Sequence, residues 1–185
     1  MERTESTERQ RFELLFDRHR RAVLGYALRR VEQPADAADA LAETFLVAWR
    51  RLDDVPAGEA ARPWLLAVAR RVLANQRRGE RRRGGLAERL GQELTTQLPA
   101  PEEGAEAARI RAALAALSDD DRELVLLAGW EELTPAQIAV VLGIRPVAAR
   151  SRLHRARRRL RAALAEADAA AAPRRTLDLA KETIR

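Results

Sequence analysis

The chain has 185 residues, of which 34 are lysine or arginine and 28 are aspartate or glutamate, so its formal net charge is +6. This length allows one or two small domains and excludes a large multidomain enzyme. The chain has no cysteine and only two histidines, which excludes a disulfide framework, a thiolate zinc site, a cysteine nucleophile and a histidine-rich metal site. No apolar run approaches the roughly 18 residues that a membrane span needs, so we expect a cytoplasmic protein without membrane insertion. A basic chain points first to nucleic acid as a partner.

Every patterned segment of the chain is predicted to be α-helical, because glycine and proline fall mostly between segments and no strand-like alternation is present. The first helix is expected over residues 10–31, before Pro34. Its apolar stripe comprises Phe12, Leu15, Phe16, His19, Val23 and Tyr26. Because His19 lies on this stripe, we expect it to be a buried core histidine.

Two further helices complete the first predicted domain. The second begins with Asp36 as its N-cap, and the third begins near Pro63, a residue favoured in a first helical turn. Their inward stripes comprise Leu41, Thr44, Phe45, Ala48, Trp49 and Leu52, and then Leu65, Val68, Ala69, Val72 and Leu73. The three stripes need one another for burial, so we expect a compact helical domain over residues 8–83.

Residues 84–105 differ in character, since they are rich in glycine, proline and acidic residues, and they are predicted to form a flexible linker. A second helical domain is expected over residues 106–166, followed by a disordered tail over 167–185. The expected fold is therefore all-α: two small helical domains joined by a flexible linker.

Charge is segregated along the chain. The second predicted helix and its flanking loops are mainly acidic, whereas the third helix is rich in arginine. The second domain repeats this order, with acidic residues before a run of eight arginines and no acid over residues 145–161. Acidic and basic surfaces in one chain indicate two kinds of partner.

The most specific local pattern is a helix-turn-helix. Thr134 and Gln137 have the spacing of a capping box, and Pro135 occupies the first helical position. Gly143 follows the short helix at the position of a left-handed C-cap, and Pro146 opens a second, arginine-rich helix. The N-terminal half of a second helix of this kind enters the major groove of DNA.

With these motifs in place, the chain resembles bacterial extracytoplasmic-function sigma factors. Residues 133–160, LTPAQIAVVLGIRPVAARSRLHRARRRL, resemble region 4.2 of that family, and 113–133, ALAALSDDDRELVLLAGWEEL, resemble region 4.1. In the first domain, residues 11–31 resemble region 2.1, 36–52 resemble region 2.2, and 62–83 resemble regions 2.3 and 2.4. The resemblance covers about residues 8–166 in the order and spacing of the family.

The resemblance implies a sigma factor that binds core RNA polymerase and directs it to promoter DNA through −35 and −10 elements. The face of region 2.2 that docks on polymerase matches Asp39, Glu43, Leu46 and Arg50. The −35 contacts match Arg145, Arg150, Ser151, His154 and Arg155, and the −10 contacts match Arg70, Arg71, Asn75 and Arg78. An anti-sigma factor is a further candidate partner, because members of the family are often held inactive by one.

Two other classes of function remain as alternatives. A stand-alone helix-turn-helix transcription regulator would bind DNA as a dimer, but the chain shows neither a long heptad run nor a sensor pocket signature. An enzyme would need a glycine-rich phosphate loop, a metal cluster or a nucleophile–base pair, and the sequence shows none. We therefore expect no catalytic residues, no metal and no cofactor.

Overall fold

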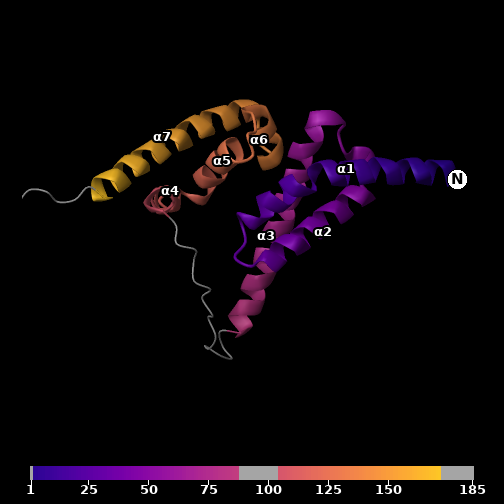
Figure 1. Cartoon of the computed structure of the whole chain (residues 1–185), viewed down its shortest axis with the longest axis horizontal. Coiled ribbons are helices and arrows are strands. Elements are labelled where there is room, and N and C mark those ends of the chain that lie inside the picture. The colour runs from indigo at the N-terminus through magenta and orange to yellow at the C-terminus, as the bar shows by residue number, and fades with distance from the viewer. Residues whose placement is uncertain (1, 88–103, 172–185) are drawn as a thin grey trace, which may run out of the picture. The chain divides into compact units, whose positions relative to one another are not determined.

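The computed structural model describes residues 2–87 and 104–171, and these residues form helices and turns without any strand (Figure 1). The all-α prediction is therefore confirmed for this part of the chain. The helices are α1 (Glu2–Leu28), α2 (Pro34–Arg50), α3 (Ala61–Ala87), α4 (Ala105–Ala115), α5 (Asp119–Gly129), α6 (Pro135–Leu142) and α7 (Pro146–Ala171). Two short 3-10 turns, Leu52–Asp54 and Gly58–Ala60, connect α2 to α3. No described helix has both the length and the apolar content that crossing a membrane requires.

The described residues pack into two compact units. The first contains residues 2–87 together with 127–150, and the second contains 104–126 together with 151–171. In this grouping α6 packs against α3 and belongs to the first unit. The domain bounds 8–83 and 106–166 remain a prediction from the sequence. Most of the predicted linker (88–103) and most of the predicted tail (172–185) lie outside the described residues.

The core of the first unit is built where the apolar faces of α1, α2 and α3 meet. Its fully buried side chains include Val23, Tyr26, Leu65 and Leu66. Phe45 of α2 lies edge-on to two rings of α1, with centroid distances of 4.8 Å to Phe16 and 6.2 Å to Phe12. All five residues predicted to face inward from α3 are buried. These contacts fix which faces of α2 and α3 remain for solvent or partners.

Two expectations for α2 were wrong. The helix begins at Pro34 with Gln33 at its N-cap, so Asp36 lies within the first turn and is not the N-cap. Its carboxylate still interacts favourably with the positive end of the helix dipole. Trp49 was expected to face inward, but it is 44% exposed. Its ring packs edge-on against Phe12 at 5.1 Å, and the remainder of the indole faces solvent.

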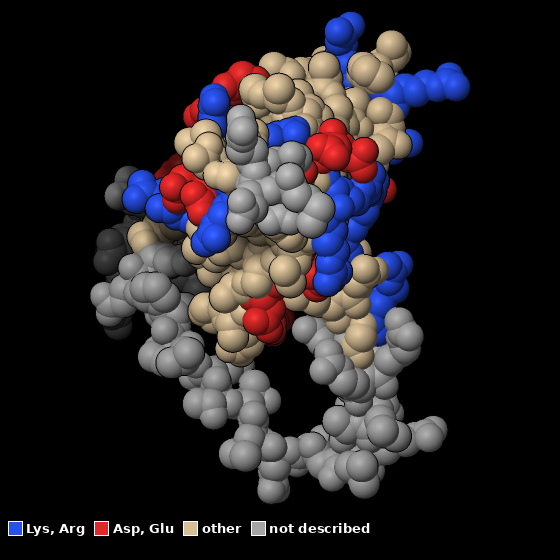
Figure 2. Space-filling model, turned by 90° about the vertical axis from the view of Figure 1, so that its right-hand side faces the viewer, with Lys and Arg blue, Asp and Glu red and all other residues tan. Residues whose placement is uncertain are grey.

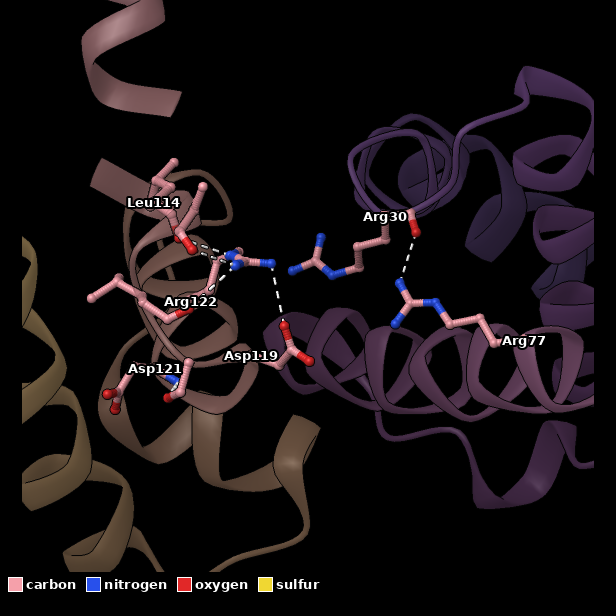
Figure 3. Close-up of polar contacts among 9 residues, drawn as sticks. Arg30, Arg77, Leu114, Asp119, Asp121 and Arg122 are labelled. Carbon is pink, nitrogen blue, oxygen red and sulfur yellow. Dashed lines mark hydrogen bonds and ion pairs between the residues drawn. The ribbon is translucent and has the colours of Figure 1, made fainter. Parts of the chain in front are cut away.

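Arginine side chains organise the second unit. Arg122 donates to the carbonyl oxygens of Leu114 at 2.8 Å and of Ala115 and Leu117 at 3.2 Å, and it pairs with Asp119 at 3.3 Å (Figure 3). The last carbonyls of a helix have no partner within the helix, so Arg122 stabilises the end of α4. α7 continues to Ala171, five residues beyond the predicted end of the second domain.

His19 is buried, as the sequence predicts, and its surroundings make the stability of the fold depend on pH. It is 7% exposed. Burial lowers the pKa of its imidazole below the usual 6.5, and the neighbouring positive charges of Arg18 and Arg62 lower it further. The folded protein therefore holds His19 neutral under conditions where an unfolded chain would bind a proton.

We predict that His19 makes the protein less stable as the pH falls below about 6.5. Well above that value neither state is protonated at His19, and as the pH falls through it the unfolded state binds a proton first. The midpoint of thermal unfolding should therefore fall between pH ~7.5 and ~5.5, and His19→Gln should flatten this dependence. His154→Gln is the matched control, because His154 is exposed. An equal loss of stability on acidification in the parent and in His19→Gln would contradict the assignment.

Candidate nucleic-acid interface

The helix-turn-helix is stabilised at both ends of α6. The backbone N–H of Gln137 donates to Thr134 Oγ1 at 3.3 Å, and the Gln137 side chain accepts from the Thr134 N–H at 2.9 Å, which completes the predicted capping box. Gly143 adopts φ 66°, a left-handed conformation that favours glycine, and the N–H of Ile144 donates to Ala139 O at 3.0 Å. The bonds at Gly143 and Ile144 end α6, and only three residues separate it from the start of α7.

The residues predicted to contact the −35 element lie at the N-cap of α7 and in its first three turns. Ala149, Leu153 and Ala156 are buried and fix the rotation of the helix. Consequently Arg145, Arg150, Ser151, His154 and Arg155 are all exposed. The backbone carbonyl of Arg145 accepts the first helical hydrogen bond, from Ala149 N at 3.0 Å, so Arg145 stands at the N-cap. The N-terminus of a helix is the end that favours anions such as phosphate.

The arginines farther along α7 divide into two kinds. Arg159 pairs with Asp121, a carboxylate whose side chain is 10% exposed and which lies in the first turn of α5. Arg157 and Arg158 are exposed and form no ion pair with any described residue. Arg159 therefore serves the packing of the second unit, whereas Arg157 and Arg158 are available to a ligand.

The solvent-facing side of α3 carries the four residues predicted to contact the −10 element. Arg70, Arg71, Asn75 and Arg78 are exposed, on the face opposite buried Val72 and Leu73. Arg78 donates a hydrogen bond to Asn75 Oδ1, so the two side chains lie together. The neighbouring Arg77 instead donates to the carbonyl oxygen of Arg30 at 2.7 Å, just beyond the end of α1 (Figure 3). The structure thus brings the four predicted residues onto one polar face and excludes Arg77 from it.

Positive charge is unevenly compensated over the first unit. Arg18 of α1 pairs with Glu59 at 2.7 Å, and Arg11 pairs with Asp53 at 3.6 Å. Figure 2 shows arginine and acidic side chains next to one another on the face that it draws. By contrast, Arg70, Arg71 and Arg150 form no ion pair with any described residue. Uncompensated arginines concentrate the positive potential that attracts a phosphate backbone.

A third surface lies on α2. Asp39, Glu43, Leu46 and Arg50 are exposed, as predicted, and Leu46 is 53% exposed. None of the three charged residues forms an ion pair within the part of the chain that the structure describes. Sequence reasoning missed Trp49, which lies three residues after Leu46 and adds its exposed indole edge to this surface. Its spacing from Leu46 was the available signal, but its spacing from Phe45 favoured the core.

The described residues contain no group of three or more His, Asp or Glu side chains that could hold a metal ion. The arrangement instead presents two basic helical faces and one acidic, partly apolar face. Helical faces with this distribution of charge are suited to phosphate contacts, base edges and protein surfaces.

Both helical parts of the chain match family models. The family model for Sigma-70 region 2 matches residues 15–83, and the model for Sigma-70, region 4 matches residues 107–160. The extracytoplasmic-function RNA polymerase sigma factor SigL of Mycobacterium tuberculosis is 35% identical over 158 residues, which cover 82% of this chain and 88% of SigL. The RNA polymerase sigma factor CarQ of Myxococcus xanthus is 34% identical over 168 residues, covering 90% of this chain and 96% of CarQ.

Two solved structures share the fold. The sigma factor RpoE of Bartonella quintana, in complex with the anti-sigma factor NepR, matches with a TM-score of 0.63 and 25% identity over 83% of this chain and 96% of RpoE. CnrH, in complex with the cytosolic domain of CnrY, matches with a TM-score of 0.59 and 28% identity over 84% of this chain and 88% of CnrH.

Proposed function

The chain belongs to the extracytoplasmic-function group of RNA polymerase sigma factors, and from that premise we propose how its three surfaces divide the work of transcription initiation. As a sigma factor it binds core RNA polymerase and directs promoter-specific initiation. A stand-alone regulator is not favoured, because the chain carries both region 2 and region 4 of a sigma factor.

Sigma factors are initiation factors and not enzymes. We propose accordingly that this chain holds no catalytic site and needs no cofactor, and that nucleotidyl transfer belongs to the polymerase. The chain would act in the cytoplasm, where polymerase and promoter DNA are found.

The α2 surface is the proposed polymerase dock. An exposed leucine and indole edge among unpaired carboxylates combines an apolar centre with a charged rim, which is the composition of a protein–protein interface. Asp39 and Glu43 lie four residues apart, and two negative charges at that spacing destabilise a helix slightly. Their placement therefore does not stabilise the isolated chain. A basic segment of the polymerase would relieve that repulsion.

The α3 and α7 faces are the proposed DNA-binding surfaces. Arg70, Arg71, Asn75 and Arg78 would contact the −10 element, where arginines bind phosphates and Asn75 can hydrogen-bond a base. Arg150, Ser151, His154 and Arg155 would read the −35 element in the major groove, with Arg145 on a phosphate at the start of α7. The observation that carries this assignment is the exposure of every one of these side chains on helices whose other faces are buried.

An anti-sigma factor is a further proposed partner. The similar sigma factors RpoE and CnrH were solved in complexes, the former with the anti-sigma factor NepR and the latter with the cytosolic domain of CnrY. A protein that covered the α2 surface would compete directly with polymerase for Leu46 and its acidic neighbours.

We predict that Asp39→Lys combined with Glu43→Lys weakens binding of the chain to core polymerase. Each replacement turns attraction to a basic partner into repulsion, and charge effects at an interface reach several kcal/mol when like charges meet. The loss of affinity should be at least about tenfold, roughly 1.4 kcal/mol, in a pull-down titration with core polymerase.

A matched control separates this effect from net charge. Glu32→Lys combined with Glu166→Lys makes the same change in charge at two exposed positions that do not belong to α2 and should leave core binding unchanged. Circular dichroism should show equal helical content in both double variants. Normal core binding by the Asp39 and Glu43 variant would show that α2 does not carry the polymerase-binding surface.

We predict that Arg150→Ala or Arg155→Ala costs about 1–3 kcal/mol on the correct −35 element and relaxes specificity at one base pair, as loss of a bidentate contact to guanine does. Promoter binding by the holoenzyme would be measured across −35 variants and several salt concentrations. Arg158→Ala is the control, and it should weaken all sequences alike and reduce the salt dependence. Arg159 is unsuitable as that control because it pairs with Asp121. An equal loss of affinity for all −35 variants would show that Arg150 and Arg155 contact phosphates and not bases.

A further inference from the structure

One carboxylate of the first unit is buried where none of the proposed surfaces uses it. Glu131 lies in the turn between α5 and α6, and its side chain is 2% exposed. Its oxygens pair with Arg29, with Arg62 at 3.4 Å and with Arg30 at 4.0 Å. Arg29 and Arg62 precede Glu131 by 102 and 69 residues. The contact therefore joins the turn before α6 to the N-terminal helices.

The N-terminal helices hold the arginine side of this contact in place. The Arg30 guanidinium stacks over the ring of Tyr26 at 3.6 Å and donates to the Tyr26 carbonyl oxygen at 2.9 Å. The carbonyl of Arg30 in turn accepts from Arg77 of α3. Arg62 lies in the first turn of α3. Glu131 therefore lies in a positively charged site whose arginines are held in place by α1 and α3.

A buried ion pair of this kind selects one arrangement more than it adds general stability. Taking a carboxylate out of water is costly, and only well-placed partners offset the cost, so the turn can dock in this position and in few others. The next residue, Glu132, adopts φ 51°, a conformation that residues other than glycine rarely take. The backbone at this turn is held in an uncommon form while Glu131 is seated.

The docked arrangement conflicts with simultaneous recognition of both promoter elements. The −35 and −10 elements are centred about 25 base pairs apart, which is about 85 Å at 3.4 Å per base pair. With 27 residues, α3 is about 40 Å long, and α6, with 8 residues, is about 12 Å long. Arg145 lies three residues beyond the end of α6, within about 11 Å. With α6 packed on α3, these lengths cannot place Arg145 and the α3 face about 85 Å apart.

We propose that Glu131 is the latch of a closed form of this sigma factor, and that the latch opens when polymerase and promoter are bound. The proposal rests on the function assigned above, because it is the distance between two promoter elements that requires opening. In the closed form, α6 and the start of α7 stay with the helices that carry the −10 face. Release of Glu131 from its three arginines frees the −35 reader to move away.

The absence of cysteine from the chain allows a direct measurement of opening. Spin labels would be placed at Ala35→Cys on α2 and Ala136→Cys on α6, two exposed positions outside the proposed contact residues. Distance measurements by pulsed electron paramagnetic resonance on the full chain should give one short, narrow distribution for the free parent. Adding core polymerase and promoter DNA should shift it to long distances. Glu131→Gln, which removes the charge and keeps the shape, should already show a long, broad population without partners.

Glu132→Gln is the matched control, since it makes the same chemical change at the exposed neighbouring residue and should retain the short distance. Arg62→Gln is a second variant that leaves Glu131 intact and should open partially. Apparent affinity scales with the fraction of molecules in the binding-competent form. The gain in affinity of Glu131→Gln for core polymerase and promoter should therefore equal the factor by which its open fraction rises.

Three results would overturn the latch. These are a short distance in free Glu131→Gln with normal helical content, an open distribution in the free parent, and a short distance retained in the promoter complex. Each can occur while the parent chain still supports promoter-specific transcription, so failure of the latch is distinguishable from failure of the proposed function. Conversely, a chain that closes through Glu131 but never binds core polymerase would retain the latch as a structural contact and lose its role in initiation.

Discussion

The surfaces of this chain depend on how its first three helices bury their apolar faces. Phe45 of α2 meets Phe12 and Phe16 of α1, and Leu65 and Leu66 of α3 are fully buried in the same unit. A helix with one apolar stripe can bury only that side, so the packing also determines what remains outside. On α2 the remaining face is acidic with an exposed leucine, and on α3 it is rich in arginine. A change of helix rotation would bury charges and expose the core at the same time.

Arginine has two separate roles in this chain, and composition alone does not distinguish them. Arg122 satisfies the last carbonyls of α4, Arg77 holds the end of α1, and Arg159 neutralises a nearly buried aspartate. Arg70, Arg71 and Arg150, by contrast, have no acidic partner among the described residues. The second group carries the potential that a nucleic acid would meet, while the first group positions the helices that present it.

The helices and their exposed faces were predictable because their signals are local. The capping box of Thr134 and Gln137, and the left-handed Gly143, are set by neighbouring residues, so their spacing suffices. The N-cap of α2 was misassigned because Gln33 and Pro34 compete with Asp36 for the same short segment. Trp49 was predicted to be buried, but how much of its ring is covered depends on its edge-on contact with Phe12 of another helix. The periodicity of α2 alone does not contain that information. Glu131 was missed for the same reason, since its partners are 69 to 102 residues away.

Run-off transcription with purified core polymerase and the full chain tests directly whether this protein acts as a sigma factor. Templates would carry a promoter selected by the holoenzyme, the same promoter with its −35 or −10 element scrambled, and no promoter. We expect a transcript of defined start that requires the chain, the core enzyme and both intact elements together. The contradicting result is specific binding of promoter DNA by the chain alone, without any chain-dependent transcript from core polymerase. The chain would then be a stand-alone regulator.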